Sequence, residues 1–408
     1  MSYLQSGQPE YTRASLALFG GAFVTFAELY ATQPLMPELS DRFQVSPALS
    51  SLSLSVATIG LAAALPFVAG ISDRWGRKRV MSVSLVASAA LSVLIACSPS
   101  FALLLVLRLI QGILIAGFPS IAMAYVNEEF LPEENARAMG LYVSGTTVGG
   151  MAGRIAISAL ADGFSWRIAL LVVGLLNLAI ALWFWRALPK PGHSEPKRIS
   201  RAELRTKLLL ALHNRSLIEL YALGFLLMGG FVAMYNYAGY LLTGEPYHLS
   251  QTIVGLVFVV YLTGTFSSAW MGKLADRIGR SRTLRMAIII AFAGCLMTFL
   301  SPLYAKIAGL ACFTFGFFGA HAVVSGWVGQ LAAGCRAQAS SFYLLFYYAG
   351  SSVAGFMGGV FWNHFGWGGV VGMVATILML ACLVERLVSL SVAGKRKNIA
   401  GIAAQGGR

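Results

Sequence analysis

The stretch Asp73-Arg74-Trp75-Gly76-Arg77-Lys78-Arg79 returns later in the chain as Asp276-Arg277-Ile278-Gly279-Arg280-Ser281-Arg282. Matched positions are always 203 residues apart, about half of the 408-residue chain. Each copy follows a long apolar run, so it predicts a tight basic turn in which the glycine lets the chain reverse. The Asp can pair with the nearby Arg groups or lie at a helix N-terminus. The repeat predicts a chain built from two related halves.

The composition indicates a protein of the lipid bilayer. Hydrophobic residues make up 57% of the chain and charged residues only 11%, whereas soluble proteins carry about 25% charged residues. This excludes a water-soluble multi-domain enzyme. The net charge of +14 suggests no nucleic-acid partner, because long uncharged runs separate the basic residues. The five cysteines form no C-x-x-C pair, so neither a metal site nor another cofactor is predicted.

Stretches of about 20 apolar residues, long enough to span a membrane as a helix, occur twelve times. Six lie in each half, and the expected fold is an all-α integral membrane protein of two six-helix bundles related by a pseudo-two-fold axis. The predicted spans are residues 14–36, 49–71, 79–97, 101–126, 137–160, 164–186, 216–242, 251–272, 284–301, 305–332, 338–360 and 368–390.

The longest polar interval divides the chain. Residues 1–187 are predicted as the N-terminal bundle, 188–215 as a cytoplasmic linker, 216–390 as the C-terminal bundle and 391–408 as a basic tail. The linker begins with prolines and continues, over about Ser200 to Leu210, with a pattern typical of a short amphipathic helix at an anionic membrane face.

The basic residues predict the orientation. With the N-terminus inside, 25 of the 30 Lys and Arg residues fall on the cytoplasmic side. Only Arg42, Arg167 and Lys306 fall outside, while Arg108 and Arg154 lie within spans. This asymmetry places both termini in the cytoplasm.

The repeated turn resembles the signature between helices 2 and 3 of the major facilitator superfamily, G-x-L-a-D-r-x-G-R-k, which is echoed between helices 8 and 9. Gly272 to Arg280 carries it fully, whereas the first copy has Ala69 in place of the glycine. The stretch from Arg108 to Gly112 resembles the R-x-x-Q-G signature of the same family, and Trp166-Arg167 its entry to helix 6. The resemblance implies a conformational switch formed by Asp73, Arg74, Gly76, Arg77, Gly272, Asp276, Arg277, Gly279 and Arg280.

Gly145, Gly149, Gly150 and Gly153 are similar to the glycine-rich antiporter motif, although its proline is missing. Residues 231–237 and 347–352 resemble the bacterial drug:proton antiporter and arabinose-efflux-permease branch. The resemblance implies a monomeric secondary transporter of the bacterial inner membrane, which exports a small molecule by alternating access in exchange for protons.

Four ionisable residues lie well inside predicted spans, away from their ends: Glu28, Arg108, Arg154 and His321. Such residues are functional candidates. Helical rise places the first three at similar depths in the outer half of the membrane, so mutual contact is expected. Burial disfavours a charged carboxylate and a guanidinium favours it, so Glu28 is predicted to exchange protons with help from Arg108. A static salt bridge is the alternative, and a structural role is favoured for Arg154. His321, which shares a face with Ser325, is either part of a proton relay or an inert hydrogen-bonded side chain.

Substrate is expected to contact polar and aromatic side chains at helical spacing, unless the tyrosines serve only packing or the interfacial belt. The candidates are Thr25 and Thr32 around Glu28, Asn236 with Tyr240, and Tyr343 with Tyr347 and Ser351. No acid lies mid-span in the second half, so a weakly polar or amphiphilic substrate is expected.

Other functions remain as alternatives. The first is a proton-coupled uptake symporter, and the second, of another class, is a non-transporting membrane receptor. A membrane enzyme would need a cluster of catalytic residues, and the sequence shows none. An ATP-driven pump would need a G-x-x-x-x-G-K-[ST] loop, which does not occur.

Overall fold

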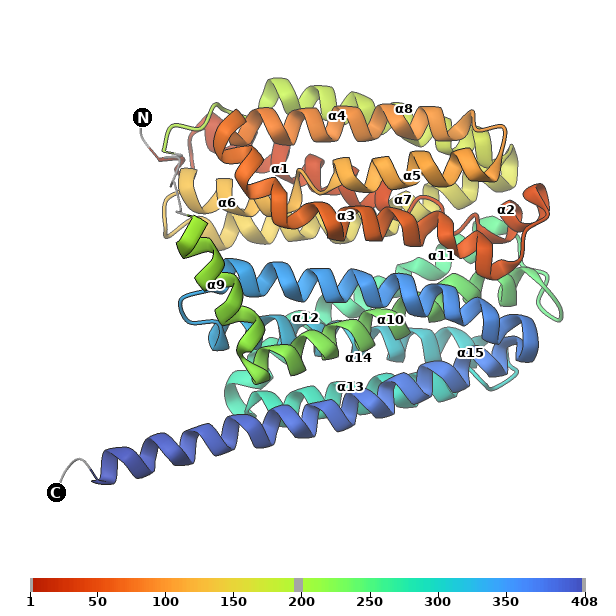
Figure 1. Cartoon of the computed structure of the whole chain (residues 1–408). Coiled ribbons are helices and arrows are strands. Elements are labelled where there is room, and N and C mark those ends of the chain that lie inside the picture. The colour runs from red at the N-terminus through yellow and green to blue at the C-terminus, as the bar shows by residue number, and fades with distance from the viewer. Residues whose placement is uncertain (1–2, 194–200, 406–408) are drawn as a thin grey trace. The chain divides into compact units, whose positions relative to one another are not determined.

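The computed structural model describes residues 3–193 and 201–405. The linker residues Lys197 and Arg198 and the last three residues of the chain lie outside this part. Within it, the chain forms fifteen α-helices and one 3-10 helix, and the β-structure consists of an isolated bridge between Leu4 and Phe130. The prediction of an all-α fold is confirmed (Figure 1).

The first half contains eight helices. They are α1 (Pro9–Leu29), α2 (Met36–Phe43), α3 (Pro47–Trp75), α4 (Arg77–Ala96), α5 (Phe101–Ile115), α6 (Pro119–Glu129), α7 (Asn135–Gly163) and α8 (Trp166–Ala187). Serine side chains begin several of them: Ser46, Ser100 and Ser165 accept a hydrogen bond from the backbone N–H three residues on. Such caps satisfy amide groups that the first helical turn leaves unpaired.

The remaining helices follow the linker. They are α9 (Arg201–His213), α10 (Arg215–Thr243), α11 (Gln251–Leu256), the 3-10 helix η1 (Val257–Val260), α12 (Tyr261–Ile278), α13 (Arg280–Met297), α14 (Leu303–Leu331) and α15 (Arg336–Gln405). The two predicted spans 338–360 and 368–390 both lie in α15, which is interrupted at Gly366, where φ is 58° and ψ is −148°. The same helix continues beyond the last predicted span to Gln405.

Two predicted spans contain a break in the α-helix that was not predicted, although Phe101–Glu129 is still long and apolar enough to be one membrane span. The span 14–36 stops as a helix at Leu29, and residues 30–35 form turns before α2 begins. The span 101–126 is divided into α5 and α6 because Pro119, which has no N–H, begins a new helix. The break after Leu29 lies one residue beyond Glu28, which is a candidate site residue.

Eight helical segments of the described chain are long and apolar enough to cross a membrane, and one of them, Arg336–Ser391, contains two predicted spans. The remaining predicted spans correspond to α1, α7 and α13. These helices contain buried or terminal charges and small residues, which lower their hydropathy.

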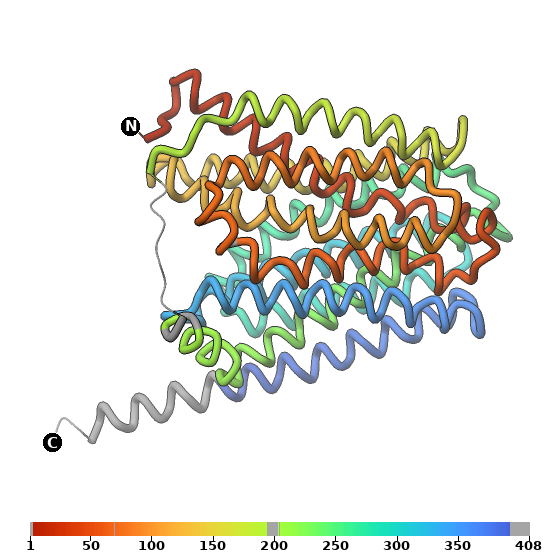
Figure 2. Tube along the Cα trace, turned by 45° about the horizontal axis from the view of Figure 1, so that its top comes forward, coloured from red at the N-terminus to blue at the C-terminus, as the bar shows by residue number. Residues whose placement is uncertain are grey.

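The described chain divides into two compact units. Unit 1 contains Met1–Arg198 together with Tyr235–Val259 and Gly355–Asn363, and unit 2 contains Ile199–Met234, Val260–Ala354 and His364–Arg408. Unit 1 thus includes the end of α10, all of α11 and part of α15, which come from the second half of the sequence. Figure 2 traces the course of the chain from one terminus to the other.

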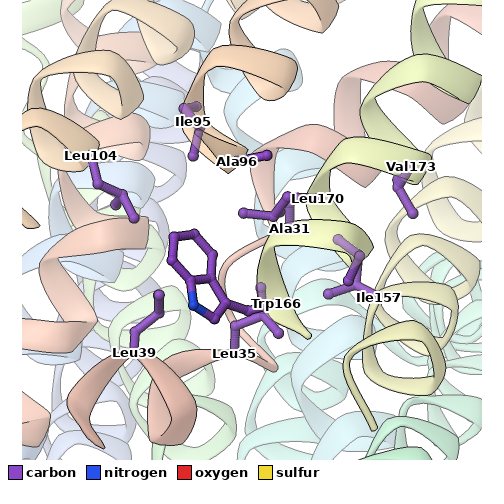
Figure 3. Packing of buried hydrophobic residues seen from close by; sticks show 11 residues of the cluster. Ala31, Leu35, Leu39, Ile95, Ala96, Leu104, Ile157, Trp166, Leu170 and Val173 are labelled. Carbon is purple, nitrogen blue, oxygen red and sulfur yellow. The ribbon is translucent and has the colours of Figure 1, made fainter. Parts of the chain in front are cut away.

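Unit 1 has an apolar core formed by the turn after α1 together with residues of α2, α4, α5, α7 and α8. Trp166 is only 3% exposed and lies among buried aliphatic side chains, including Leu39, Leu104 and Leu170 (Figure 3). Glu38 accepts a hydrogen bond from the backbone N–H of Trp166 at 3.1 Å, which ties α2 to the start of α8. In unit 2, α13 and α14 approach so closely at Gly294 and Gly316 that an added Cβ would overlap backbone atoms of the facing helix.

Candidate functional site

Both copies of the repeated stretch form the predicted tight turn. Gly76 ends α3 and begins α4 with a φ of 88°, and Gly279 does the same between α12 and α13 with a φ of 93°. This positive φ is open to glycine at little cost. The same glycine conformation at the same place in each half supports the prediction of two related halves.

The two turns differ in their side-chain contacts. In the first turn, Arg77 donates to both carboxylate oxygens of Glu128 on α6, from Nε at 2.5 Å and from Nη2 at 2.6 Å. Arg77 also lies 3.5 Å from an oxygen of Asp73 and donates to the Ser72 hydroxyl at 3.0 Å. In the second turn, Asp276 makes no ion pair within the described residues. Glu128 was not singled out from the sequence, because it lies 51 residues from its partner.

The Glu28 carboxyl group is buried without a hydrogen-bond partner. Its side chain is on the last full turn of α1 and is 1% exposed. Within the described residues, neither carboxyl oxygen has a partner. Glu28 thus faces the interior of the first half.

Arg108 binds backbone carbonyl groups and makes no ion pair with the Glu28 carboxylate. Its Nη1 and Nη2 atoms donate to the carbonyl oxygens of Glu28 and Leu29 at 2.9 and 2.6 Å. Nε donates to the carbonyl oxygen of Ser53 at 2.8 Å, and Nη1 also donates to Oε1 of Gln111 at 2.6 Å. The contact expected between Glu28 and Arg108 thus runs through the backbone carbonyl, and the static salt bridge considered as the alternative is not formed.

Further polar groups lie in the same interior. Gln111 donates to the Ser88 carbonyl at 3.0 Å and to the Ser92 hydroxyl at 2.7 Å. Asn177 on α8 is 1% exposed, and neither its amide oxygen nor its nitrogen has a partner among the described residues. The sequence analysis did not select Asn177, because a single amide inside an apolar run gives little signal.

Arg154 has different hydrogen-bond partners from Arg108. Its Nε donates to Oε1 of Gln33 at 2.7 Å, and Nη1 donates to the Gly150 carbonyl one turn earlier on α7. The guanidinium carbon lies 4.0 Å from the ring centroid of Tyr30 and 4.9 Å from that of Phe258. These contacts fit the structural role favoured from the glycine-rich surroundings, although a part in proton coupling stays a prediction.

Asn236 and Tyr240, both predicted to contact substrate, are hydrogen-bonded to segments of the first half. Asn236 accepts from Nε2 of Gln33 at 2.8 Å. The Tyr240 hydroxyl donates to the Met36 carbonyl at 2.8 Å and lies 2.6 Å from the Ser40 hydroxyl. Gln33 was missed from the sequence; the only signal was a polar residue directly before Pro34 inside an apolar run.

Of the two threonines near Glu28, only Thr25 lies on the same helix. Thr25 is on α1 and donates to the Gly21 carbonyl at 2.7 Å. Thr32 lies beyond the end of the helix, in the turn, and its buried hydroxyl has no partner among the described residues. The i+4 spacing predicted for Thr32 is wrong, because α1 ends at Leu29.

The remaining candidates gather in unit 2. His321 of α14 lies with Nδ1 2.8 Å from the Tyr343 hydroxyl, and its ring is 4.8 Å from that of Tyr347. The ring of Phe317 lies nearly parallel to the same imidazole, with the ring centroids 6.1 Å apart. Ser351 lies one turn further along α15, and its hydroxyl is buried. The structure thus brings three of the predicted residues into direct contact.

The second half contains one buried acid that the sequence analysis did not weigh. Glu385 on α15 is 0% exposed and accepts from Nε and Nη2 of Arg285 at 2.9 and 3.3 Å. The Ser281 hydroxyl donates to the same carboxylate. Both carboxylate oxygens of Glu385 therefore have hydrogen-bond partners, unlike those of Glu28. Among the described residues, no three His, Cys, Asp or Glu side chains are arranged to bind a metal ion.

A helical chain with many apolar spans, two related halves and buried charges between its helices defines a multi-pass membrane transporter. The model of the Major Facilitator Superfamily matches residues 18–355, and the chain belongs to this family.

Its relatives agree with this assignment. The chain is 44% identical over 392 residues to the MFS-type transporter YybF of Bacillus subtilis (strain 168), covering 96% of this chain and 97% of YybF. It is 42% identical over 382 residues to the inner membrane transport protein YnfM of Escherichia coli (strain K12), covering 94% and 92%.

Solved structures share the fold. A bacterial homologue of the human lysosomal transporter Spinster, in an inward-facing and unoccupied conformation, superposes with a TM-score of 0.79 at 17% identity, covering 95% of this chain and 98% of that one. The nucleoside transporter NupG superposes with a TM-score of 0.74 at 16% identity, covering 92% and 99%.

Proposed function

We propose that this transporter exports a weakly polar or amphiphilic small molecule across the bacterial inner membrane in exchange for protons. The observation that carries the proposal is the Glu28 carboxyl group, which is buried in the first half without a hydrogen-bond partner among the described residues. An unpaired carboxylate is very costly to bury. We infer that Glu28 carries a proton in this conformation.

The position of Glu28 supports a coupling role. Its helix ends one residue later, and Arg108 binds the carbonyl oxygens of Glu28 and Leu29. A shift of the end of α1 would therefore change both the distance from the carboxyl group to the guanidinium and its access to water. An exchangeable proton at such a point can be taken up in one conformation and released in the other.

Because α1 packs closely on α7, a movement of α1 would also displace α7. A Cβ at Gly149 would lie 2.3 Å from the Phe23 carbonyl oxygen, and one at Gly153 would lie 2.8 Å from Cβ of Ala27. Further along α7, Ser158 packs just as closely on Gly255 of α11. We infer that a shift of the end of α1 is passed to α7 and, in the conformation described, to α11.

The aromatic groups of unit 2 support the proposed substrate class. His321, Tyr343 and Tyr347 offer ring faces and neutral hydrogen-bonding groups. The buried carboxylate of that half, Glu385, is already paired with Arg285. A neutral or weakly polar ligand suits such groups better than a strongly charged one.

Transport by the purified protein in proteoliposomes tests this proposal, with a panel of amphiphilic compounds and an imposed pH gradient. Antiport predicts that a substrate accumulates when the lumen is acidic. Accumulation only with an acidic exterior would instead establish the uptake symporter. Binding without any accumulation, under either gradient and across the panel, would favour the receptor.

A further inference from the structure

Gln33 joins two residues that lie far apart in the sequence. Its Oε1 accepts from Nε of Arg154 on α7 at 2.7 Å, and its Nε2 donates to Oδ1 of Asn236 on α10 at 2.8 Å. All three side chains are at most 3% exposed. A single amide therefore connects a helix of the first half with the end of a helix from the second half, inside unit 1.

The surroundings make this connection energetically important. The guanidinium of Arg154 is held between the rings of Tyr30 and Phe258. Gln33 also lines a small, mainly apolar pocket with Ala238 and Phe258. When one member of a buried hydrogen-bonded chain is removed, its partners are left buried and unsatisfied, which costs more than the bond itself contributes.

We propose that Gln33 is a positioning residue that holds the end of α10 against α7, and that this side of the transporter opens only when Gln33 releases Asn236. The amide suits this task because it donates to one partner and accepts from the other without carrying charge. The nearby bond from Tyr240 to the Met36 carbonyl adds a second tie between the same segments. This assignment goes beyond the proposed proton antiport and does not depend on the direction of transport.

A reporter cysteine can measure the opening. Ala238 is 5% exposed and lines the pocket beside Gln33, so Ala238→Cys should react slowly with a membrane-impermeant maleimide. Cys97, which is exposed, is first replaced by Ser. The full-length protein is labelled in membrane vesicles without substrate or a proton gradient. The result therefore tests the role of Gln33 alone and does not depend on whether the protein is a proton antiporter.

Gln33→Met keeps the length of the side chain but loses both hydrogen bonds. We expect it to increase the labelling rate at residue 238 about tenfold, because the open state gains population when the closed state loses these bonds. Gln251→Met is the matched control. It makes the same chemical change in α11, also in unit 1, and touches neither Arg154 nor Asn236; its labelling rate should equal that of the parent.

Gln33→Glu distinguishes positioning from simple packing. A carboxylate still accepts from Arg154, and Asn236 can turn its amide by 180° to donate to it, since its Nδ2 has no partner among the described residues. Labelling should therefore stay near the parent rate. Asn236→Val removes the other partner of the Gln33–Asn236 hydrogen bond. The labelling rate of the double variant with Gln33→Met should therefore be close to that of either single variant.

Mass spectrometry of the buried Cys295 and Cys335 reports on unfolding, because both should remain unlabelled in a folded variant. If Gln33→Met does not fold, Asn236→Val provides the same test. Parent-like labelling of residue 238 in the folded Gln33→Met or Asn236→Val variant would overturn the proposal. So would equally fast labelling in Gln33→Glu and Gln33→Met.

Discussion

Arg108 caps the end of α1: its Nη2 atom donates to the carbonyl oxygen of Leu29 at 2.6 Å. Leu29 is the last residue of that helix, and a cation is favoured at a helix C-terminus. The adjacent residue is Glu28, so the charge of Arg108 acts on the carboxyl group from a position fixed by the backbone. The relationship explains why a fully buried guanidinium needs no carboxylate partner here.

Arg108→Gln should therefore destabilise the protein strongly. It removes several hydrogen bonds to buried carbonyl oxygens, and breaking such a buried charged network costs about 3–5 kcal/mol. Arg108→Lys should recover only part of this loss, because an ammonium group lacks the planar donor fork. Thermal unfolding in detergent measures both. Arg42→Gln, at an exposed site of α2, is the control, and an equal effect at both positions would contradict the capping role.

The Arg77–Glu128 pair should control turnover and leave substrate affinity unchanged. Glu128→Gln weakens a contact between the first basic turn and α6. Because the pair is remote from the predicted substrate residues, we expect turnover to change about tenfold, within the usual range of conformational coupling energies. Asp73→Asn should have a smaller effect, since its distance to Arg77 is 3.5 Å. Transport kinetics measure the maximal rate and the substrate affinity separately. A loss of affinity at an unchanged maximal rate would refute this assignment.

The contact between α7 and α11 should weaken in acid. Asp162 lies beyond the predicted span 137–160, and the Thr252 hydroxyl donates to its carboxylate at 2.7 Å. This hydrogen bond, above all, lowers the pKa of Asp162 below its ordinary value. A lowered pKa means that the contact stabilises the fold above the ordinary Asp pKa, and that this stabilisation is lost as the pH falls through the lowered value.

The unfolding temperature of Asp162→Asn measures this effect. Its difference from the parent should shrink as the pH falls below the ordinary Asp pKa and through the lowered value, because Asp162 then gains a proton and becomes neutral, as Asn is. Thr252→Val, which removes the donor, should behave in the same way. A difference that does not change with pH would show that the carboxylate charge plays no part in the contact.

Cys97 offers a test of the predicted orientation. It is exposed at the end of α4, on the side that the basic residues predict to be outside. A membrane-impermeant maleimide added to intact cells should therefore label the protein, and Cys97→Ser should abolish the labelling. Labelling only after the membrane is permeabilised would place this end of α4, and with it the termini, on the opposite side from that predicted.

Features that depend on a local sequence pattern could be predicted from the sequence alone. The repeated glycine turns follow from the two D-R-x-G-R-x-R stretches, and most spans follow from hydropathy alone. The break at Leu29 could not be predicted, because the Arg108 side chain that binds the carbonyl oxygen of Leu29 lies 79 residues away in the sequence. Long-range partners explain the other omissions as well. Glu128 and Gln33 matter only because folding brings Arg77, Arg154 and Asn236 to them.

The proposed proton coupling rests on Glu28, and the most direct test is gradient-driven accumulation in proteoliposomes by Glu28→Gln. The parent should concentrate a transported compound in an acidic lumen. Glu28→Gln should lose this accumulation while it still equilibrates the same compound down its own gradient. Glu10→Gln, at an exposed site of the same helix, should behave like the parent. Accumulation by Glu28→Gln at the parent level would contradict the account.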